Sequence, residues 1–404
     1  MIVMFENTKY KYSFKDFFVV FFLIFPIISR WLLPSSLEYG LTKSILNIPI
    51  FLPNILFIFF IFIAKRNRRN HRLKIIFLLH FFVAIVGIII NEYTDKLAFI
   101  VSGMNYFYAI FLALFYRITE SQKLILRKVL FITLLILFLE VILYSTGVLT
   151  YSLDITSGYE FGGIYRISTT VAAATGTAGL IFLLGCLVLY MYGKTFLGYL
   201  SFILTSISIF LLISRGAIAA LILFALLYFW NDVRRSFKKF VVAILLLGAF
   251  ITIMYNMALF DPFISRMEIL NYEGDLSTGR VERIEHSLSA INESGNYLFG
   301  VGTGNVFFSK DFKILNLKRK YPGSPHNSYV LTYIEQGLFG ILFFILFWIL
   351  LLHTIRHNKS LFYTLISFVA ILFNTETVFI VESEFVFFLS VVIMLALENK
   401  ELKN

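Results

Sequence analysis

The sequence predicts an all-α integral membrane protein, a polytopic bundle of about 12 transmembrane helices with one large extracytoplasmic loop. Of its 404 residues, 59% are hydrophobic and only 15% are charged, which is more apolar surface than a soluble core can bury. These residues form runs, most of them of about 17 to 25 residues, the length that crosses a hydrocarbon layer ~30 Å thick, and the last two runs are shorter. The basic residues gather in short segments between the runs, a pattern typical of membrane topology rather than of nucleic-acid binding.

Each apolar run is expected to form one helix. Lys9, Lys11 and Lys15 precede the first run and no small-residue cleavage site follows it, so this run is expected to remain as an uncleaved span. Glu140 and His80 lie within runs and are expected to be hydrogen-bonded inside the bundle. The predicted spans are 16–33, 45–64, 75–90, 98–116, 129–149, 167–192, 196–213, 216–230, 240–258, 328–352, 361–373 and 385–397.

The distribution of lysine and arginine predicts the orientation of the bundle. With both termini in the cytoplasm, the cytoplasmic segments hold 22 of the 35 lysine and arginine residues, as the positive-inside rule requires. Residues 259–327 are too long for a connector and translocate regardless of charge. The chain therefore divides into helices 1–258, an outer catalytic loop 259–327, and C-terminal helices with a cytoplasmic tail, 328–404. The predicted cytoplasmic segments are 1–15, 65–74, 117–128, 193–195, 231–239, 353–360 and the tail.

An amphipathic helix is expected at about 278–292, with Ser277 as its N-cap. Arg280 and Arg283 border its apolar stripe, while Glu285 points away. Arginine is the residue expected where a pyrophosphate is held, because its planar fork donates two hydrogen bonds and stays charged. The alternative is ordinary snorkelling or pairing with neighbouring acids. The stripe consists of Val281, Ile284, Leu288 and Ile291.

The segment NYLFGVGTGN contains three alternate glycines, Gly300, Gly302 and Gly304. A nucleotide-binding loop of this kind follows a strand inside a βαβ unit, and no such unit is present in the pattern. A tight turn that returns the chain to the membrane is expected instead.

His326 stands directly before Asn327 and Ser328, which can cap the helix of span 328–352. The helix dipole disfavours an imidazolium there, so a neutral histidine able to accept a proton is expected. The alternative is a capping or interfacial histidine. Tyr329 and Tyr333 follow on one helical face with Gly337 and Gly340, and this face is expected to form a groove with polar tips for an acceptor.

Two further arginines lie at the outer ends of spans. Arg215 stands between two apolar runs with almost no loop, and a charge so placed is a functional candidate. Arg166 opens span 167–192, whose first half is rich in small residues that suit either close helix packing or room for a substrate. Cys186 is the only cysteine, so neither a disulfide nor a cysteine-based metal site is expected.

Four motifs occur in a characteristic order: Arg215 in SRG, Arg280 in STGR, the LFGVGTGN turn, and PHNSYVLTYIEQGLFG. Over roughly residues 160–345, they resemble the O-antigen ligase and polymerase family of bacterial membrane proteins. The resemblance implies a GT-C-like, metal-independent inverting glycosyltransferase without cofactors, acting on undecaprenyl-pyrophosphate-linked glycans at the outer face of the cytoplasmic membrane. It implies that Arg215 and Arg280 contact the pyrophosphate and that His326 lies beside the acceptor. Arg166 resembles the family's arginine only loosely, because the Asn-Pro pair that usually follows is replaced by STTVAAATG.

The prediction is a polymerase of lipid-linked oligosaccharide repeat units of O-antigen, capsule or exopolysaccharide. Its partners would be the lipid-linked units, membrane lipid and a chain-length regulator protein. One alternative is a ligase that transfers finished polymer to its final acceptor. Another is a flippase-type transporter, which would place charge along a central cavity within its spans, whereas the charges here collect at the outer ends.

Overall fold

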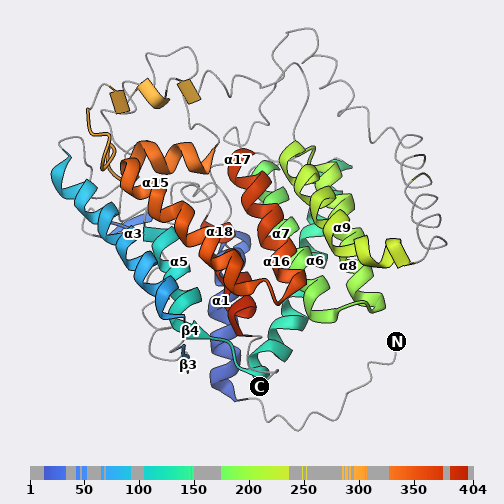
Figure 1. The fold of residues 1–404 in the computed structure, drawn as a ribbon. Helices are drawn as coiled ribbons and strands as arrows, with labels where there is room; N and C mark the ends of the chain where they lie inside the picture. Colours follow the sequence, from blue (N-terminus) through green and yellow to red (C-terminus); the bar gives the residue numbers. More distant parts are fainter. Residues whose placement is uncertain are drawn as a thin grey trace.

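The computed structural model is a helical bundle (Figure 1). It describes residues 13–32, 42–45, 48–51, 65–67, 70–91, 104–146, 148–149, 174–235, 248, 252, 284–285, 287–289, 291–292, 295–304, 306, 327–375 and 383–398.

Most described helices coincide with predicted spans. The N-terminal half contains α1 (Phe14–Leu32), α3 (His71–Ile90), α5 (Met104–Phe115), α6 (Glu120–Ser145) and α7 (Ala174–Tyr192). The C-terminal half contains α8 (Phe196–Leu211), α9 (Arg215–Arg235), α15 (Ser328–Ile355), α16 (Lys359–Ser367), the π-helical turn η4 (Phe368–Leu372), α17 (Phe373–Thr375) and α18 (Ser383–Glu398). The number 12 stays a prediction, because residues 52–64 and most of 240–258 lie outside the described residues.

One predicted span begins differently. Residues expected to start a helix at 45 instead form the antiparallel pair β1 (Thr42–Ile45) and β2 (Ile48–Phe51), with Ile45 opposite Ile48. Pro49 lacks a backbone N–H and disfavours a helix interior, and the β-branched residues around it favour strands. The predicted start of this span is therefore wrong.

Among the described residues, two helices, α3 and α15, are long and apolar enough to cross a membrane, and only 39% and 33% of their apolar windows are buried. The core helix of a soluble protein would be mostly buried. Here α3 packs against α15 and still exposes Ile75, Phe82 and Ile89. An apolar face of this kind is consistent with contact to lipid, and hence with a helical membrane protein.

Small residues allow close packing between α7 and α8. A Cβ atom on Gly185 would collide with Thr205 of α8, so only glycine permits this approach. Residues 176–179 of the small-residue stretch are also buried. Close packing accounts for this part of the stretch, and residues 167–173 lie outside the described residues.

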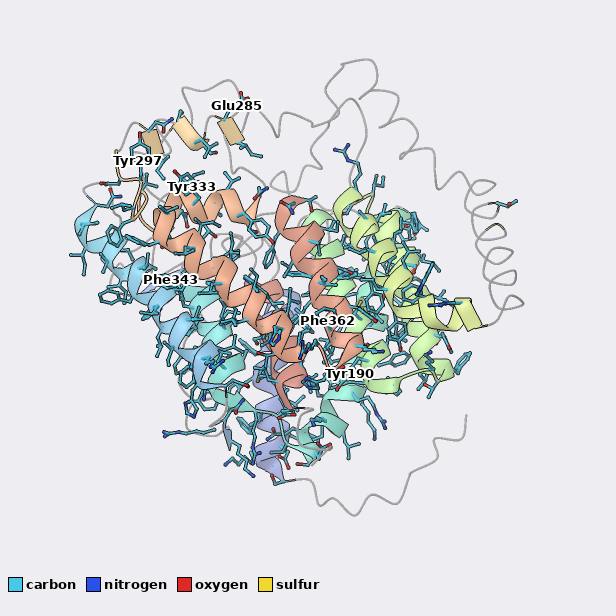
Figure 2. The ribbon with its side chains drawn as sticks, viewed as in Figure 1. Tyr190, Glu285, Tyr297, Tyr333, Phe343 and Phe362 are labelled. Carbon is cyan, nitrogen blue, oxygen red and sulfur yellow. The ribbon has the colours of Figure 1, made fainter. Side chains whose placement is uncertain are left out.

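Several predicted cytoplasmic segments lie together at one end of the bundle. Strand β3 (Lys65–Arg66) pairs with β4 (Tyr116–Arg117). Lys123 Nζ lies 2.9 Å from Glu398 Oε2 at the end of α18. Figure 2 shows Glu285, Tyr297 and Tyr333 at the opposite end. The grouping agrees with the predicted topology, while the compartment that each end faces stays a prediction.

Candidate functional site: a glycine loop bound to a broken helix

Helix α15 is broken at Gly337, which adopts φ 66° and ψ −162°. The first turns of α15 lie across one end of the bundle, and the remainder descends into it (Figure 1). In an unbroken helix, the amides of residues 338 and 339 would bond to the carbonyls of residues 334 and 335. The break leaves these four backbone groups without helical partners, although buried backbone groups require them.

Residues 297–302 provide a partner for each of the four groups. Leu338 N donates to Tyr297 O at 2.8 Å, and Phe339 N donates to Leu298 O at 3.2 Å. In return, the carbonyl oxygens of residues 334 and 335 accept hydrogen bonds of 2.8 Å and 2.9 Å from the amides of residues 301 and 302. The loop therefore replaces the missing helical bonds and fixes the direction of the break.

The glycines of the loop confirm the predicted tight turn. Gly300, Gly302 and Gly304 have φ values of 71°, 97° and 87°, which favour glycine because a Cβ atom is disfavoured there. A Cβ on Gly300 would lie 2.5 Å from Gln336 N, and one on Gly337 would lie 2.5 Å from Phe299 N. Residues 298 and 299 therefore occupy the Gly337 part of the face on which an acceptor groove was expected.

Helix α3 holds the loop from the other side. Asn91, buried at the end of α3, donates from Nδ2 to Gly300 O at 2.6 Å. A Cβ on Gly87 would lie 2.8 Å from Phe299 O, so a glycine is needed for this approach. His80 Nε2 lies 2.5 Å from Gln336 Oε1 in the buried interface of α3 and α15, which confirms the predicted hydrogen bond of His80 inside the bundle.

Glu335 is a buried carboxyl group at the break, and it accepts hydrogen bonds from the backbone amides of Gly304 and Val306. The carboxyl group therefore ties the end of the glycine loop to α15. Sequence reasoning did not select Glu335 or Asn91. Both residues could have been identified from the sequence as polar side chains inside or beside an apolar run, where an unpaired polar group is costly.

The start of α15 is capped as predicted. Asn327 Oδ1 accepts hydrogen bonds of 3.0 Å from Tyr329 N and Val330 N. Its amide nitrogen donates to Asn374 Oδ1 at 3.3 Å, which links the cap to α17. Asn327 therefore fixes the point at which the chain leaves His326 and begins the helix.

Helix α17 also contacts the start of α9. Gly216 lies so close to Thr375 that a Cβ atom on Gly216 would collide with Thr375 Oγ1. Arg215 precedes Gly216 as the first residue of α9 and is partly buried. The starts of α9 and α15 therefore meet neighbouring residues of α17, and the positive ends of both helix dipoles favour an anion nearby.

The remaining predicted site residues fall into two groups. The Tyr329 hydroxyl donates to Val369 O at 2.9 Å and therefore points into the bundle. Tyr333 is partly buried at the end of the bundle that carries the glycine loop, which we call the loop end (Figure 2). In the predicted amphipathic helix, Ile291 is buried and Glu285 is exposed, as the stripe predicted. The residues outside the described part of the chain are Arg166, Arg280, Arg283 and His326.

Within the described ranges, no group of three or more His, Cys, Asp or Glu side chains could hold a metal ion. Comparison with known proteins adds one match: residues 200–345 fit a family model described as O-antigen ligase. The matched segment runs from α8 into α15 and contains Arg215, the glycine loop and Glu335. A search of the curated proteins finds no match.

Proposed function

We propose that this chain, whose residues 200–345 fit the O-antigen ligase family model, joins lipid-linked oligosaccharide repeat units into longer glycans. The donor is a glycan on undecaprenyl pyrophosphate, and the acceptor is a sugar hydroxyl of another lipid-linked unit. The reaction takes place at the outer face of a bacterial cytoplasmic membrane, with both termini of the chain in the cytoplasm.

The donor side of the reaction requires positive charge. The bond between the anomeric carbon and the phosphate oxygen breaks, and the leaving lipid pyrophosphate gains negative charge. Arg280 and Arg215 hold this pyrophosphate, with Arg283 and Arg166 as further candidates, because prearranged guanidinium groups stabilise developing charge without reorganisation. The starts of α9 and α15 add the partial positive charges of two helix N-termini.

The acceptor side requires a base. The acceptor oxygen attacks the anomeric carbon from the face opposite the pyrophosphate, which inverts the configuration, and His326 takes the hydroxyl proton. The Tyr329 hydroxyl already donates to Val369 O, whereas the Tyr333 hydroxyl has no hydrogen bond to another described residue. We therefore assign acceptor contact to Tyr333 ahead of Tyr329.

The observation that carries the proposal is the family match, because the matched segment includes most of the predicted residues. The contacts of α17 support it. Asn327 follows His326 in the chain and binds Asn374, while Gly216 follows Arg215 and packs against Thr375. Because Asn374 and Thr375 are adjacent residues, the chain positions next to His326 and next to Arg215 lie close together.

The experiment is a transfer assay with the purified full chain and lipid-pyrophosphate-linked repeat units, without ATP or added metal. We expect elongated glycans, and a loss of at least about 100-fold in rate for Arg280→Ala and for His326→Ala. Arg356→Ala is the matched control, since Arg356 is exposed near the predicted cytoplasmic end. Wild-type rates in either site variant would remove that residue from the mechanism.

A second candidate function is that of a ligase, which the description of the matched family favours. A ligase would transfer finished polymer from the same lipid pyrophosphate to its final acceptor, with the same arginines and histidine. Deleting the protein from cells separates the two. Single repeat units on the final acceptor indicate a lost polymerase, whereas full-length polymer retained on the lipid indicates a lost ligase.

A further inference from the structure

We propose that Asn91 and Glu335 are positioning residues that hold the glycine loop, residues 297–304, against the break in α15 and thereby set where Arg280 and His326 stand. We call Asn91, Glu335 and the broken backbone at Gly337, together with this loop, the loop clasp. This role rests on the proposed function, but the attachment of the loop can be measured without it.

The clasp lies between the two predicted catalytic segments. Before the loop, Ile291 of the amphipathic segment is buried, and the chain continues through Gly295. Just beyond the loop, the amide of Val306 donates to Glu335, and the side chain of Asn327 caps α15. Val306 and Asn327, the residues on either side of segment 307–326, are thus both fixed to the first turns of α15.

Two kinds of contact hold the loop, and they depend on different residues. The four backbone bonds to the broken helix require the break itself and therefore Gly337. The side-chain bonds are the donation from Asn91 to Gly300 O and the acceptance by Glu335 from Gly304 and Val306. Removing one of these side chains leaves buried backbone groups without a partner, so the loop is expected to loosen without losing the helix.

Asn91 extends the functional machinery beyond the matched family segment. It lies at the end of α3, more than one hundred residues before residue 200 in the chain. The same helix makes room for Phe299 at Gly87 and is tied to α15 by His80 and Gln336. Helix α3 therefore helps to position the glycine loop, in addition to packing against α15.

A structural role alone would lower protein abundance or thermal stability and leave the kinetic parameters of the folded protein unchanged. A positioning role lowers kcat, because misplaced catalytic groups are still present but no longer aligned. It changes KM for the lipid-linked unit less than it changes kcat, since Arg215 at the start of α9 lies outside the loop and still binds the pyrophosphate. Glu335→Gln keeps an acceptor oxygen for the two amides, so its rate should lie between those of wild type and Glu335→Ala.

The experiment combines a spectroscopic and a kinetic measurement on the full chain. A nitroxide label is placed at Tyr297→Cys, an exposed position on the loop, while the single native cysteine, Cys186, is buried. Asn91→Ala and Glu335→Ala are compared with Asn358→Ala, which removes another buried asparagine, one that donates to Tyr190 Oη near the opposite end. Label mobility and transfer kinetics are recorded for folded, monodisperse protein.

We expect the label to become more mobile, and kcat to fall about 10- to 100-fold, in Asn91→Ala and Glu335→Ala but not in Asn358→Ala. An unchanged label in both site variants would overturn the clasp, whatever the activity. A mobile label with wild-type kcat would overturn the positioning role. Should the wild type show no transfer, the proposed function fails while the label still decides the clasp. If Glu335→Ala does not fold, Asn91→Ala decides alone.

Discussion

The two ends of the bundle are held together in different ways. At the loop end, backbone meets backbone, and Gly87, Gly300 and Gly337 leave no space for a Cβ atom. At the opposite end, the backbone contact is the short β3–β4 pair, and helices α6 and α18 are joined by side chains, in the ion pair of Lys123 with Glu398. Gly193, in the turn between α7 and α8, has nothing within 4 Å of a Cβ atom. The loop end therefore depends on backbone geometry, which few substitutions can preserve.

We expect the greatest loss of stability from Gly337→Ala. Its φ of 66° and ψ of −162° lie in a region that only glycine adopts readily, and the new Cβ would lie 2.5 Å from Leu298 O. We expect a loss of about 3 kcal/mol or more in unfolding free energy, from strain and collision together, and loss of transfer. Thermal unfolding of the purified protein measures the first.

Gly193→Ala is the matched control for Gly337→Ala. Gly193 has a similar φ of 61° but open surroundings, so only the backbone strain of about 1–2 kcal/mol applies. Equal losses of unfolding free energy in Gly337→Ala and Gly193→Ala would show that the close backbone packing at the loop end adds nothing to its stability.

We expect a smaller loss of stability from a substitution at the contact between α9 and α17. Gly216→Ala forces a methyl group against Thr375 and should cost about 1–3 kcal/mol by overpacking. Thr375→Ala removes the hydroxyl and methyl groups of that side chain and should restore part of the loss in the double variant. A double-mutant cycle by thermal unfolding measures the coupling. Simple additivity would show that Gly216 and Thr375 are not in contact.

The smallest effect is expected from Lys123→Met at the opposite end. Burial would lower the pKa of Lys123, but its bonds to Glu120 and Glu398 outweigh burial and raise that pKa above 10.5. A raised lysine pKa contributes stability below the ordinary value and loses it only above the raised one. We therefore expect the same loss, about 1–2 kcal/mol, at about pH 7 and about pH 9.

The control for Lys123→Met is Lys128→Met, because Lys128 is exposed on the same helix. Its unfolding free energy should change by less than about 0.5 kcal/mol. If the loss of unfolding free energy in Lys123→Met disappears between about pH 7 and about pH 9, the ion pair is not its cause.

The sequence predicted features that depend on local pattern. Apolar runs located the helices, Asn327 was recognised as a cap, and the glycine string was recognised as a tight turn. It did not predict the break at Gly337, because a glycine within an apolar helix usually indicates close packing. The partners of that break lie on a loop more than thirty residues earlier in the chain, and pattern cannot show such pairing. The hairpin at 42–51 was missed because apolar composition outweighed the signal of Pro49.

The catalytic assignments are predictions of a different kind. Arg280 and His326 rest on the resemblance and on the chemistry of a pyrophosphate leaving group. What the structure adds is the placement of their described neighbours, Ile291, the glycine loop and Asn327. Residue types alone could not have indicated that Asn91, far away in the sequence, holds the loop between them.

The proposed function requires the loop end to face the outside of the cell. In intact cells, a membrane-impermeant maleimide tests this orientation at Tyr297→Cys, with Lys359→Cys, the exposed first residue of α16, as the opposite-end position. The buried Cys186 should give no background. We predict that Tyr297→Cys reacts in intact cells and that Lys359→Cys reacts only after the membrane is permeabilised. The reverse result would place the loop in the cytoplasm and contradict glycan transfer at the outer face.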